Sequence, residues 1–275
     1  MVGACNQIYG LDSTRVRDLE PPPCATVQFS APIELEQFDD EHNNETEFDP
    51  QLSATGLELW YAAQPEASSG PSLLFRGERA STDEPFTVAI VDLVGMNARS
   101  HADPALTADG RRMIFRVDTT PPSLFEAVRQ DGEQFPFDEI LPVNGFAQFG
   151  SLGVESFDLT WDGLRMYIAV KQGQLWLAQR DDRNKPFTKF IDLGMRNVHF
   201  PTISGDELEL FYTLYDMGSS GHSLYRRERA DVDSPFGAEA LVLDDGADPD
   251  IAPTSSQMIV GRDKSLALLQ RRCDD

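Results

Sequence analysis

Short apolar runs alternate with polar turns along most of the chain, and helical periodicity is almost absent. Five related stretches each precede one such run; the runs cover residues 59–61, 113–115, 166–168, 210–212 and 258–260. Two of the stretches end in Asp-Gly, which predicts a β-hairpin because Asp accepts local backbone hydrogen bonds and Gly tolerates positive φ. The equivalent turn positions recur every 44 to 54 residues and are Gly56, Gly110, Gly163, Glu207 and Ser255. Because the last two lack Gly, we expect a different turn type there.

A second pattern follows each of these turns. A Leu precedes an Arg by five residues in every repeat, with strand-like residues between them; the arginines are Arg79, Arg129, Arg180, Arg229 and Arg271. In four repeats a polar turn and a Pro-Phe pair then open another apolar strand; these Phe residues are Phe86, Phe137, Phe187 and Phe236. Each repeat therefore contains four antiparallel strands joined by short turns, and such repeats are typical of β-propeller blades.

The fifth repeat ends before its outermost strand. The segment from Phe29 to Leu35 has the Phe-to-Leu spacing of that strand and precedes the first complete repeat. If it pairs with the C-terminal strands, the ring closes without an exposed edge. The sequence thus predicts an all-β, five-bladed propeller of four-stranded antiparallel blades, with the last blade closed by the N-terminal strand. We expect the propeller to span residues 25–275, with blades at about 48–93, 103–143, 156–193, 200–243, and 249–272 plus 25–35.

Two cysteines lie beside the predicted closure. Cys24 and Cys273 stand at the two ends of the turn that the split blade lacks, where complete blades carry a covalent connection. A disulfide there would replace that connection, and in the chain-entropy model a loop of this length contributes about 5 kcal/mol. The alternative is a pair of free surface thiols.

The third cysteine, Cys5, ends the sequence Val2-Gly-Ala-Cys5, which resembles a bacterial lipobox. The charged and apolar parts of a signal peptide are missing before it, so the chain looks truncated upstream or started late. The alternative is a chance cluster of small residues. Lipidation would anchor the domain at a membrane surface without spanning it. We expect residues 1–24 to combine this start with a polar tether that ends in Pro21-Pro-Pro23.

The formal net charge is −23 and is spread along the chain. Charge of this sign repels a phosphate backbone, so no nucleic-acid partner is expected. The acidic loop at residues 39–47 has oxygen ligands enough for calcium but no EF-hand pattern, which favours a solvated loop and no cofactor. The four histidines, at positions 42, 101, 199 and 222, show no zinc spacing, so no metal site is expected.

With the repeats aligned, the chain resembles the TolB-type β-propeller repeat family, whose inner strand carries Pro-x-(Leu/Ile)-Ser-x-Asp-Gly. Residues 104–110 match this motif well, residues 50–56 have Thr55 for the Asp, and residues 201–207 lack the Gly. The resemblance covers residues 25–272 and is specific for fold. It implies an interaction platform of the bacterial cell envelope, as members of this class mostly are, and it brings no catalytic residue set.

The first residues of the inner strands are expected to ring one mouth of the central channel. These are Asp49, Asp103, Glu155 or Ser156, His199 or Phe200, and Asp248. Such a ring could hold a cation or grip polar groups of a peptide or sugar. In the alternative interpretation, Asp before Pro only caps the entering backbone and contacts solvent.

Two functions follow from these patterns. The first is a monomeric, lipid-anchored, non-catalytic binding or scaffold protein of the outer membrane or periplasm, holding an envelope protein, peptide or glycan. The second is a glycan-cleaving enzyme, because five-bladed glycosidases such as arabinanases also place carboxylates at the starts of successive inner strands. Asp49, Asp103 and Glu155 would then be the catalytic candidates.

Overall fold

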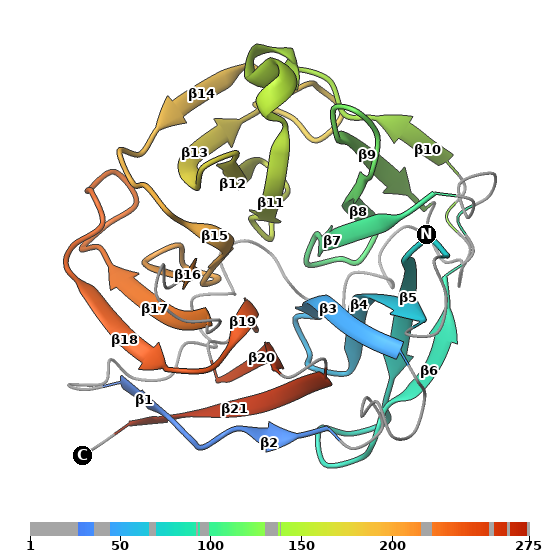
Figure 1. The fold of residues 1–275 in the computed structure, drawn as a ribbon, viewed down its shortest axis with the longest axis vertical. Helices are drawn as coiled ribbons and strands as arrows, with labels where there is room; N and C mark the ends of the chain where they lie inside the picture. Colours follow the sequence, from blue (N-terminus) through green and yellow to red (C-terminus); the bar gives the residue numbers. More distant parts are fainter. Residues whose placement is uncertain are drawn as a thin grey trace, which may run out of the picture.

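The computed structural model contains five antiparallel sheets arranged as the blades of a ring (Figure 1). It describes residues 27–35, 45–65, 70–91, 93, 99–129, 137, 139–215, 222–252, 256–262 and 265–273. Blade 1 contains β3 (Glu45–Leu52), β4 (Glu58–Pro65), β5 (Leu73–Glu78) and β6 (Thr87–Ile90); blade 2 contains β7 (His101–Leu106), β8 (Arg112–Val117), β9 (Ser123–Val128) and β10 (Glu139–Pro142). Blade 3 contains β11 (Val154–Leu159), β12 (Arg165–Val170), β13 (Gln174–Gln179) and β14 (Lys189–Asp192); blade 4 contains β15 (His199–Ile203), β16 (Glu209–Tyr215), β17 (His222–Glu228) and β18 (Glu239–Leu243). The predicted five-bladed propeller of four-stranded blades is confirmed.

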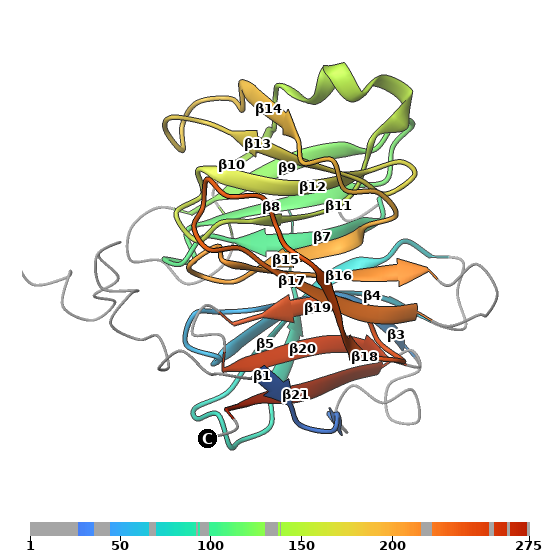
Figure 2. The same cartoon turned by 90° about the vertical axis from the view of Figure 1, so that its left-hand side faces the viewer.

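Blade 5 is assembled from both ends of the chain. Its strands β19 (Ala247–Ile251), β20 (Gln257–Arg262) and β21 (Ser265–Cys273) are completed by β1 (Val27–Phe29) and β2 (Ile33–Glu34), both paired with β21 (Figure 2). Ile33 lies opposite Leu268, and Val27 lies opposite Cys273. The closure by the N-terminal segment is therefore confirmed. The segment forms two short strands rather than one because Pro32, which has no N–H, interrupts the ladder between them.

The hydrophobic core lies between the blades. Among the described residues, five clusters of buried side chains each fill one interface between neighbouring blades. The cluster between blades 1 and 5 includes Leu52, Tyr61, Ile259 and Leu268, so the blade that the N-terminal segment completes is packed like the others. Each blade therefore depends on two neighbours for its buried surface, and the closed ring supplies both.

The repeated Arg and Phe hold each blade to its own first turn. The Nε of Arg180 donates to the Gly163 carbonyl at 2.7 Å, and its guanidinium lies 4.6 Å from the centre of the Phe187 ring. The same pair of contacts is made by Arg79 with Gly56 and Phe86, and by Arg229 with Glu207 and Phe236. The far end of the guanidinium reaches the preceding blade, as in the 2.9 Å ion pair between Arg180 and Glu126. The Leu-x₄-Arg and Pro-Phe patterns therefore have a structural cause.

The turn at Glu207 corrects one sequence expectation. Glu207 has a φ of 61°, close to the values of 69°, 62° and 71° at Gly56, Gly110 and Gly163, so the predicted change of turn type is wrong there. A non-glycine residue is tolerated in this strained conformation because its side chain is held by several partners. The Glu207 carboxylate pairs with Arg165 and accepts a 3.1 Å hydrogen bond from the Tyr167 hydroxyl. The fifth turn position, Ser255, lies outside the described residues.

Gly163 offers a direct test of these turns. We expect Gly163→Ala to lower the free energy of unfolding by about 2 kcal/mol, since Ala costs about 1 kcal/mol at positive φ and the new Cβ would also lie too close to a neighbour. That neighbour is the Thr107 methyl group, 2.8 Å from the position that the Cβ would take. Gly194→Ala is the matched control, because Gly194 has a similar φ of 74° and open space around its Cβ position. Urea denaturation should show the smaller loss for Gly194→Ala; equal losses would contradict the packing argument.

The predicted lipidation site, disulfide and acidic loop involve residues that the structure does not fully describe. Cys5, Cys24 and most of the acidic loop at residues 39–47 lie outside the described residues, and of Cys273 only the backbone is described.

Within the described residues, no helix has the length and apolar character needed to cross a membrane. A short 3-10 helix, η3 (Phe146–Leu152), which the sequence patterns did not predict, joins blades 2 and 3. Its Phe146 and Phe149 pack against Phe190 in blade 3.

Candidate functional site

Each inner strand bends sharply where it enters the channel. Asp49, Asp103, Phe200 and Asp248 have φ values between 46° and 51°, each precedes a Pro, and the strand pairing shifts register at each of these points. A bulge of this kind twists the strand and redirects the side chain that it carries. We call these four residues, together with Ser156 of β11, the entry ring.

The entry ring joins neighbouring blades by hydrogen bonds. The Asp49 carboxylate accepts from the Asp103 N–H at 3.1 Å, and the Ser156 hydroxyl accepts from the Phe200 N–H at 2.9 Å. Asp248 of blade 5 makes the equivalent contact with blade 1, because its carboxylate accepts from the Asp49 N–H. Of the alternatives left open by the sequence, Ser156 and Phe200 therefore occupy the repeat position, and Glu155 and His199 each lie one residue before it.

A second layer of inter-blade contacts lies two residues further along the inner strands. We call its members the belt; they are Gln51, Ala105, Asp158, Thr202 and Asp250. Asp250 accepts from the Leu52 N–H at 2.6 Å, Asp158 from the Ile203 N–H at 2.8 Å, Gln51 from the Leu106 N–H at 3.3 Å, and Thr202 from the Ile251 N–H at 3.4 Å. Each polar belt residue thus bonds to the backbone of the next blade. Ala105 has no polar side chain, so it makes no such bond from blade 2 to blade 3.

Burial raises the pKa values of the entry-ring carboxyl groups. The pKa of Asp49 is raised well above its usual value. Burial is the main cause, and the charges of Asp103 and Asp248 add to it. Burial and then Asp103 raise the pKa of Asp248 to about 7. Burial also raises the pKa of Asp103, although the nearby Arg116 guanidinium opposes it. Three carboxyl groups this close together in a buried site cannot all ionise freely at neutral pH.

The belt carboxyl groups are raised for the same reason. Burial raises the pKa of Asp158 to about 6, against hydrogen bonds from Ile203, Leu159 and Thr202 that favour the ionised form. Burial and then the charge of Asp158 raise the pKa of Asp250 well above its usual value. The centre of the ring therefore holds protons that exposed aspartates would have released.

One arginine compensates part of this acidity. Arg116 of β8 pairs with Asp103 at 2.6 Å and with Asp118 at 2.5 Å. Burial lowers the pKa of Arg116, but the charge of Asp103 and its hydrogen bond outweigh this, so that the net pKa lies above its usual value. Arg116 is therefore a fixed positive charge beneath the channel mouth.

A mixed group of side chains lies above the entry ring. His199 Nδ1 is 3.7 Å from Glu155 Oε2, and the Tyr215 ring lies 4.2 Å from the His199 ring and 4.7 Å from the His222 ring. Burial raises the pKa of Glu155, while Lys171 and Arg116 oppose the change. Glu155 Oε2 is buried and has no hydrogen-bond partner in the described part of the chain. We call Glu155, His199, Tyr215 and His222 the mouth group.

The channel inside the ring is narrow. The space lined by entry-ring and belt residues has a volume of about 30 Å³. Sites for small molecules typically have about 300–1,000 Å³, and one water molecule takes about 30 Å³ of liquid. The space between the entry ring and the belt is therefore far smaller than a typical small-molecule site, and it holds little more than water. Among the described residues, no group of three or more His, Cys, Asp or Glu is placed to hold a metal ion.

The structure thus places Asp49, Asp103 and Asp248 together, the first two buried and Asp248 half-buried, with Glu155 and His199 beside one another at the mouth. Sequence reasoning missed Arg116, Tyr215 and the belt. The belt left a signal: four of the five residues two positions after the entry ring are polar, although they lie on strands that are otherwise apolar at their centres. Arg116 and Tyr215 left none, because their positions on the second strands follow no repeat.

No family model matches the chain, and no curated protein matches its sequence. Among solved structures it resembles TolB from Acinetobacter baumannii, with a TM-score of 0.52 and 12% identity over 82% of this chain; the match spans about half (54%) of the TolB chain. It also resembles the catalytic domain of a GH62 α-L-arabinofuranosidase from Coprinopsis cinerea, with a TM-score of 0.63, 10% identity, and coverage of 91% and 98%. An α-L-arabinofuranosidase from Podospora anserina in complex with cellotriose gives a TM-score of 0.62, 10% identity, and coverage of 92% and 98%. At these identities the likenesses show the fold alone.

Proposed function

We propose that the protein is a non-catalytic binding or scaffold propeller of the bacterial cell envelope, and that its mouth group holds an envelope protein, peptide or glycan. One observation carries the proposal. The Asp49 and Asp248 carboxylates already bond to the backbone of the next blade, and the Asp103 carboxylate pairs with Arg116 of its own blade, so the fold itself accounts for all three. Above them, the mouth group offers two imidazoles, a phenol and a carboxylate for polar recognition, with only a narrow space beneath.

The proposal includes a lipid anchor on Cys5, with residues 1–24 as its tether. The lipobox-like sequence supports it, and mass spectrometry of the N-terminal peptide after expression in a bacterial envelope tests it.

The proposal also includes a disulfide between Cys24 and Cys273. The register supports this pairing: Cys273 lies opposite Val27, and the three residues from Cys24 to Val27 span at most about 10 Å. Free thiols at both positions in the exported protein would contradict the proposed disulfide.

A glycan-cleaving enzyme is the second candidate. The observation in its favour is Glu155, a carboxyl group with a raised pKa at the mouth, one of whose oxygens has no hydrogen-bond partner among the described residues. A raised pKa is what a general acid needs in glycoside hydrolysis. Against it, the Asp49 carboxylate bonds to the backbone of blade 2, the Asp103 carboxylate pairs with Arg116, and the space beside them is too small for a sugar ring.

Turnover separates the two candidates. We expect the wild-type protein to release no product from arabinan, arabinoxylan or aryl glycosides. Turnover that disappears in Glu155→Gln, while the variant keeps the wild-type melting temperature, would establish the enzyme and end the binding proposal.

Binding then tests the proposal itself. In a screen of immobilised envelope glycans and peptides, we expect a ligand whose affinity falls about tenfold or more in His199→Ala and Glu155→Ala, since each removes a polar contact in a partly buried site. Lys189→Ala on the outer strand β14 serves as the control and should bind as the wild type does. A ligand that binds all of these variants equally would show that the mouth group is not the binding site.

A further inference from the structure

The bonds that join neighbouring inner strands are missing at one interface of the ring. Side-chain bonds of the entry ring or the belt link blade 1 to blade 2, blade 3 to blade 4, blade 4 to blade 5, and blade 5 to blade 1. Among the described residues, no such bond links β7 of blade 2 to β11 of blade 3. We call this boundary between β7 and β11 the seam.

The residues on both sides of the seam explain why these bonds are missing. Asp103, the entry-ring residue of blade 2, directs its carboxylate to Arg116 of its own blade at 2.6 Å. Ala105, the belt residue of blade 2, has no polar atom in its side chain. In blade 3, the Leu159 N–H, which a belt bond would use, donates instead to the Asp158 carboxylate of its own strand at 2.7 Å.

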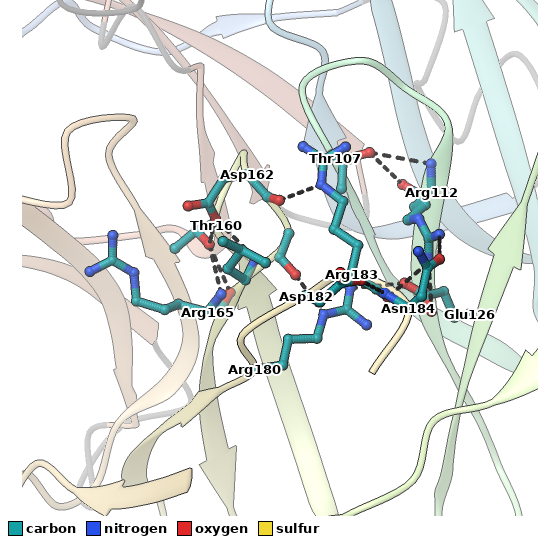
Figure 3. Close-up of polar contacts among 12 residues, drawn as sticks. Thr107, Arg112, Glu126, Thr160, Asp162, Arg165, Arg180, Asp182, Arg183 and Asn184 are labelled. Atoms are coloured by element: carbon teal, nitrogen blue, oxygen red, sulfur yellow. Dashed lines mark hydrogen bonds and ion pairs between the residues drawn. The ribbon is translucent and has the colours of Figure 1, made fainter. Parts of the chain in front are cut away.

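The opposite ends of blades 2 and 3, at their first turns, are joined by polar contacts. The Ala108 N–H donates to the Trp161 carbonyl at 3.0 Å, which links one turn to the other. Beside it, Arg180 of blade 3 pairs with Glu126 of blade 2 at 2.9 Å. Further contacts between the blades lie at this end; they are Arg183 with Asp109, and Arg112 with the Arg183 carbonyl and with Asn184 (Figure 3). The two blades are therefore fixed to one another at the turns and not at the mouth.

Apolar side chains fill the interface between these two ends. Ala105 of blade 2 and Phe157 of blade 3 belong to the same buried cluster. The helix η3, which connects the two blades, makes its aromatic contacts outside the helix with blade 3; the partners are Trp176, Phe187 and Phe190. Apolar contact has no preferred direction, whereas a hydrogen bond weakens steeply when its angle changes. The seam therefore resists a small movement less than the other interfaces do.

The seam also lies next to the mouth group. Glu155 stands at the start of β11, on the blade 3 side, and Arg116 lies on the blade 2 side. Arg116 lowers the pKa of Glu155 against the effect of burial, but its hydrogen bonds go to Asp103 and Asp118 of its own blade. At this end of the seam, an attraction between charges replaces the bonds that other blades make.

We propose that the ring opens at the seam: blades 2 and 3 part at the mouth by a hinge movement about their joined first turns. Local opening occurs where few directional contacts hold neighbouring units together. The narrow space below the mouth is lined by residues of both blades, including Pro104 and Phe157, so this movement widens it. The inference concerns the movement of the ring and does not depend on which ligand the mouth group binds.

Reaction of a buried thiol with iodoacetamide measures this opening in the full chain. Ala105→Cys places a thiol on the blade 2 side of the seam, where Ala105 is 1% exposed. We expect this thiol to react at least about tenfold faster than the thiol of Ala63→Cys, because the seam lacks the side-chain bonds that restrain the control interface. Mass spectrometry of the peptide that contains the new cysteine distinguishes it from the three native ones.

Ala63→Cys is the matched control. Ala63 of β4 is 0% exposed and lies in the cluster between blades 1 and 5. That interface is crossed by the bonds of Asp248 to the Asp49 N–H and of Asp250 to the Leu52 N–H. Global unfolding would expose both thiols alike, so a faster reaction at the seam reports local opening. Equal rates, or a faster reaction of the Ala63→Cys thiol, would overturn the proposal.

Relaxation-dispersion NMR of the wild-type protein tests the same movement without a substitution. Hinge movements fall in the range of microseconds to milliseconds that this method detects. We expect exchange contributions at the amides of β7 and β11, and flat profiles at those of β3 and β19, whose interface carries both kinds of bond. Flat profiles along β7 and β11, or contributions of equal size in all four strands, would overturn the proposal.

Discussion

Replacing Arg180 with Leu is expected to lower the free energy of unfolding by about 3–4 kcal/mol, since removing one partner of a buried ion pair leaves the other charge without compensation. The Arg180 side chain is 2% exposed. It pairs with Glu126 of blade 2 at 2.9 Å and donates to the Gly163 carbonyl at 2.7 Å. The variant keeps Arg112 near Glu126 at 3.3 Å, which limits the loss. Urea denaturation followed by circular dichroism measures the change.

Arg196→Leu is the matched control for this prediction. It breaks the ion pair between Arg196 and Asp192, in which the Arg196 side chain is 52% exposed. Solvent screens a surface pair of this kind, so we expect a much smaller loss than in Arg180→Leu. Equal losses in the two variants would contradict the assignment of the repeated Arg as a link between blades.

Lowering the pH from about 8 to about 6 is expected to stabilise the protein by about 2 kcal/mol, taking about 1.36 kcal/mol for each unit of pKa change. Asp248 and Asp158 have pKa values of about 7 and about 6 in the fold, raised above the 3.8 of an exposed Asp, chiefly by burial. A carboxyl group with a raised pKa in the folded state favours folding while it is protonated, and this contribution is lost as the pH rises through that pKa. Asp49 and Asp250, whose pKa values are also raised, act in the same direction.

Two histidines oppose this trend at the acid end. Burial lowers the pKa of His101 and of His199, so protonating them below about pH 6.5 destabilises the fold. The two histidines therefore reduce the gain in stability below about pH 6.5, while the four aspartates with raised pKa values go on stabilising the fold as the pH falls toward about 4. Asp248→Asn resembles the protonated residue, so this variant should be more stable than the wild type at about pH 8 and depend less on pH. Melting temperatures that rise with pH over this range would contradict the argument.

The fold could be predicted from the sequence because the repeated residues themselves form the turns and contacts that define a blade. The Leu-to-Arg spacing, whose Arg180 stacks on Phe187, recurs in all five blades; the Pro-Phe strand starts recur in four, and the Asp-Gly turns in two. Strand closure was predictable because pairing in a ring must account for every edge. The conformation of Glu207 was not, because its side-chain partners Arg165 and Tyr167 come from the neighbouring blade.

The candidate site was predictable only in part. The entry positions of Asp49, Asp103 and Asp248 follow from the repeat, but their hydrogen bonds to adjacent blades depend on the bulge at each Asp-Pro. Arg116 and Tyr215 lie on the second strands of blades 2 and 4, and nothing in the local sequence indicates that Arg116 pairs with Asp103 or that Tyr215 contacts His199. Contacts between blades join residues of different repeats, so predicting them requires the three-dimensional arrangement of the blades.

The central claim is that burial raises the pKa values of the carboxyl groups around the channel well above those of exposed aspartates, while these groups bond to neighbouring blades. A titration of the aspartate side-chain carboxyl carbons by ¹³C NMR tests it most directly, with Asp248→Asn and Asp158→Asn used to assign the signals. We predict midpoints at about pH 7 for Asp248 and about pH 6 for Asp158. Midpoints near about pH 4 for both, as for exposed aspartates, would contradict the account.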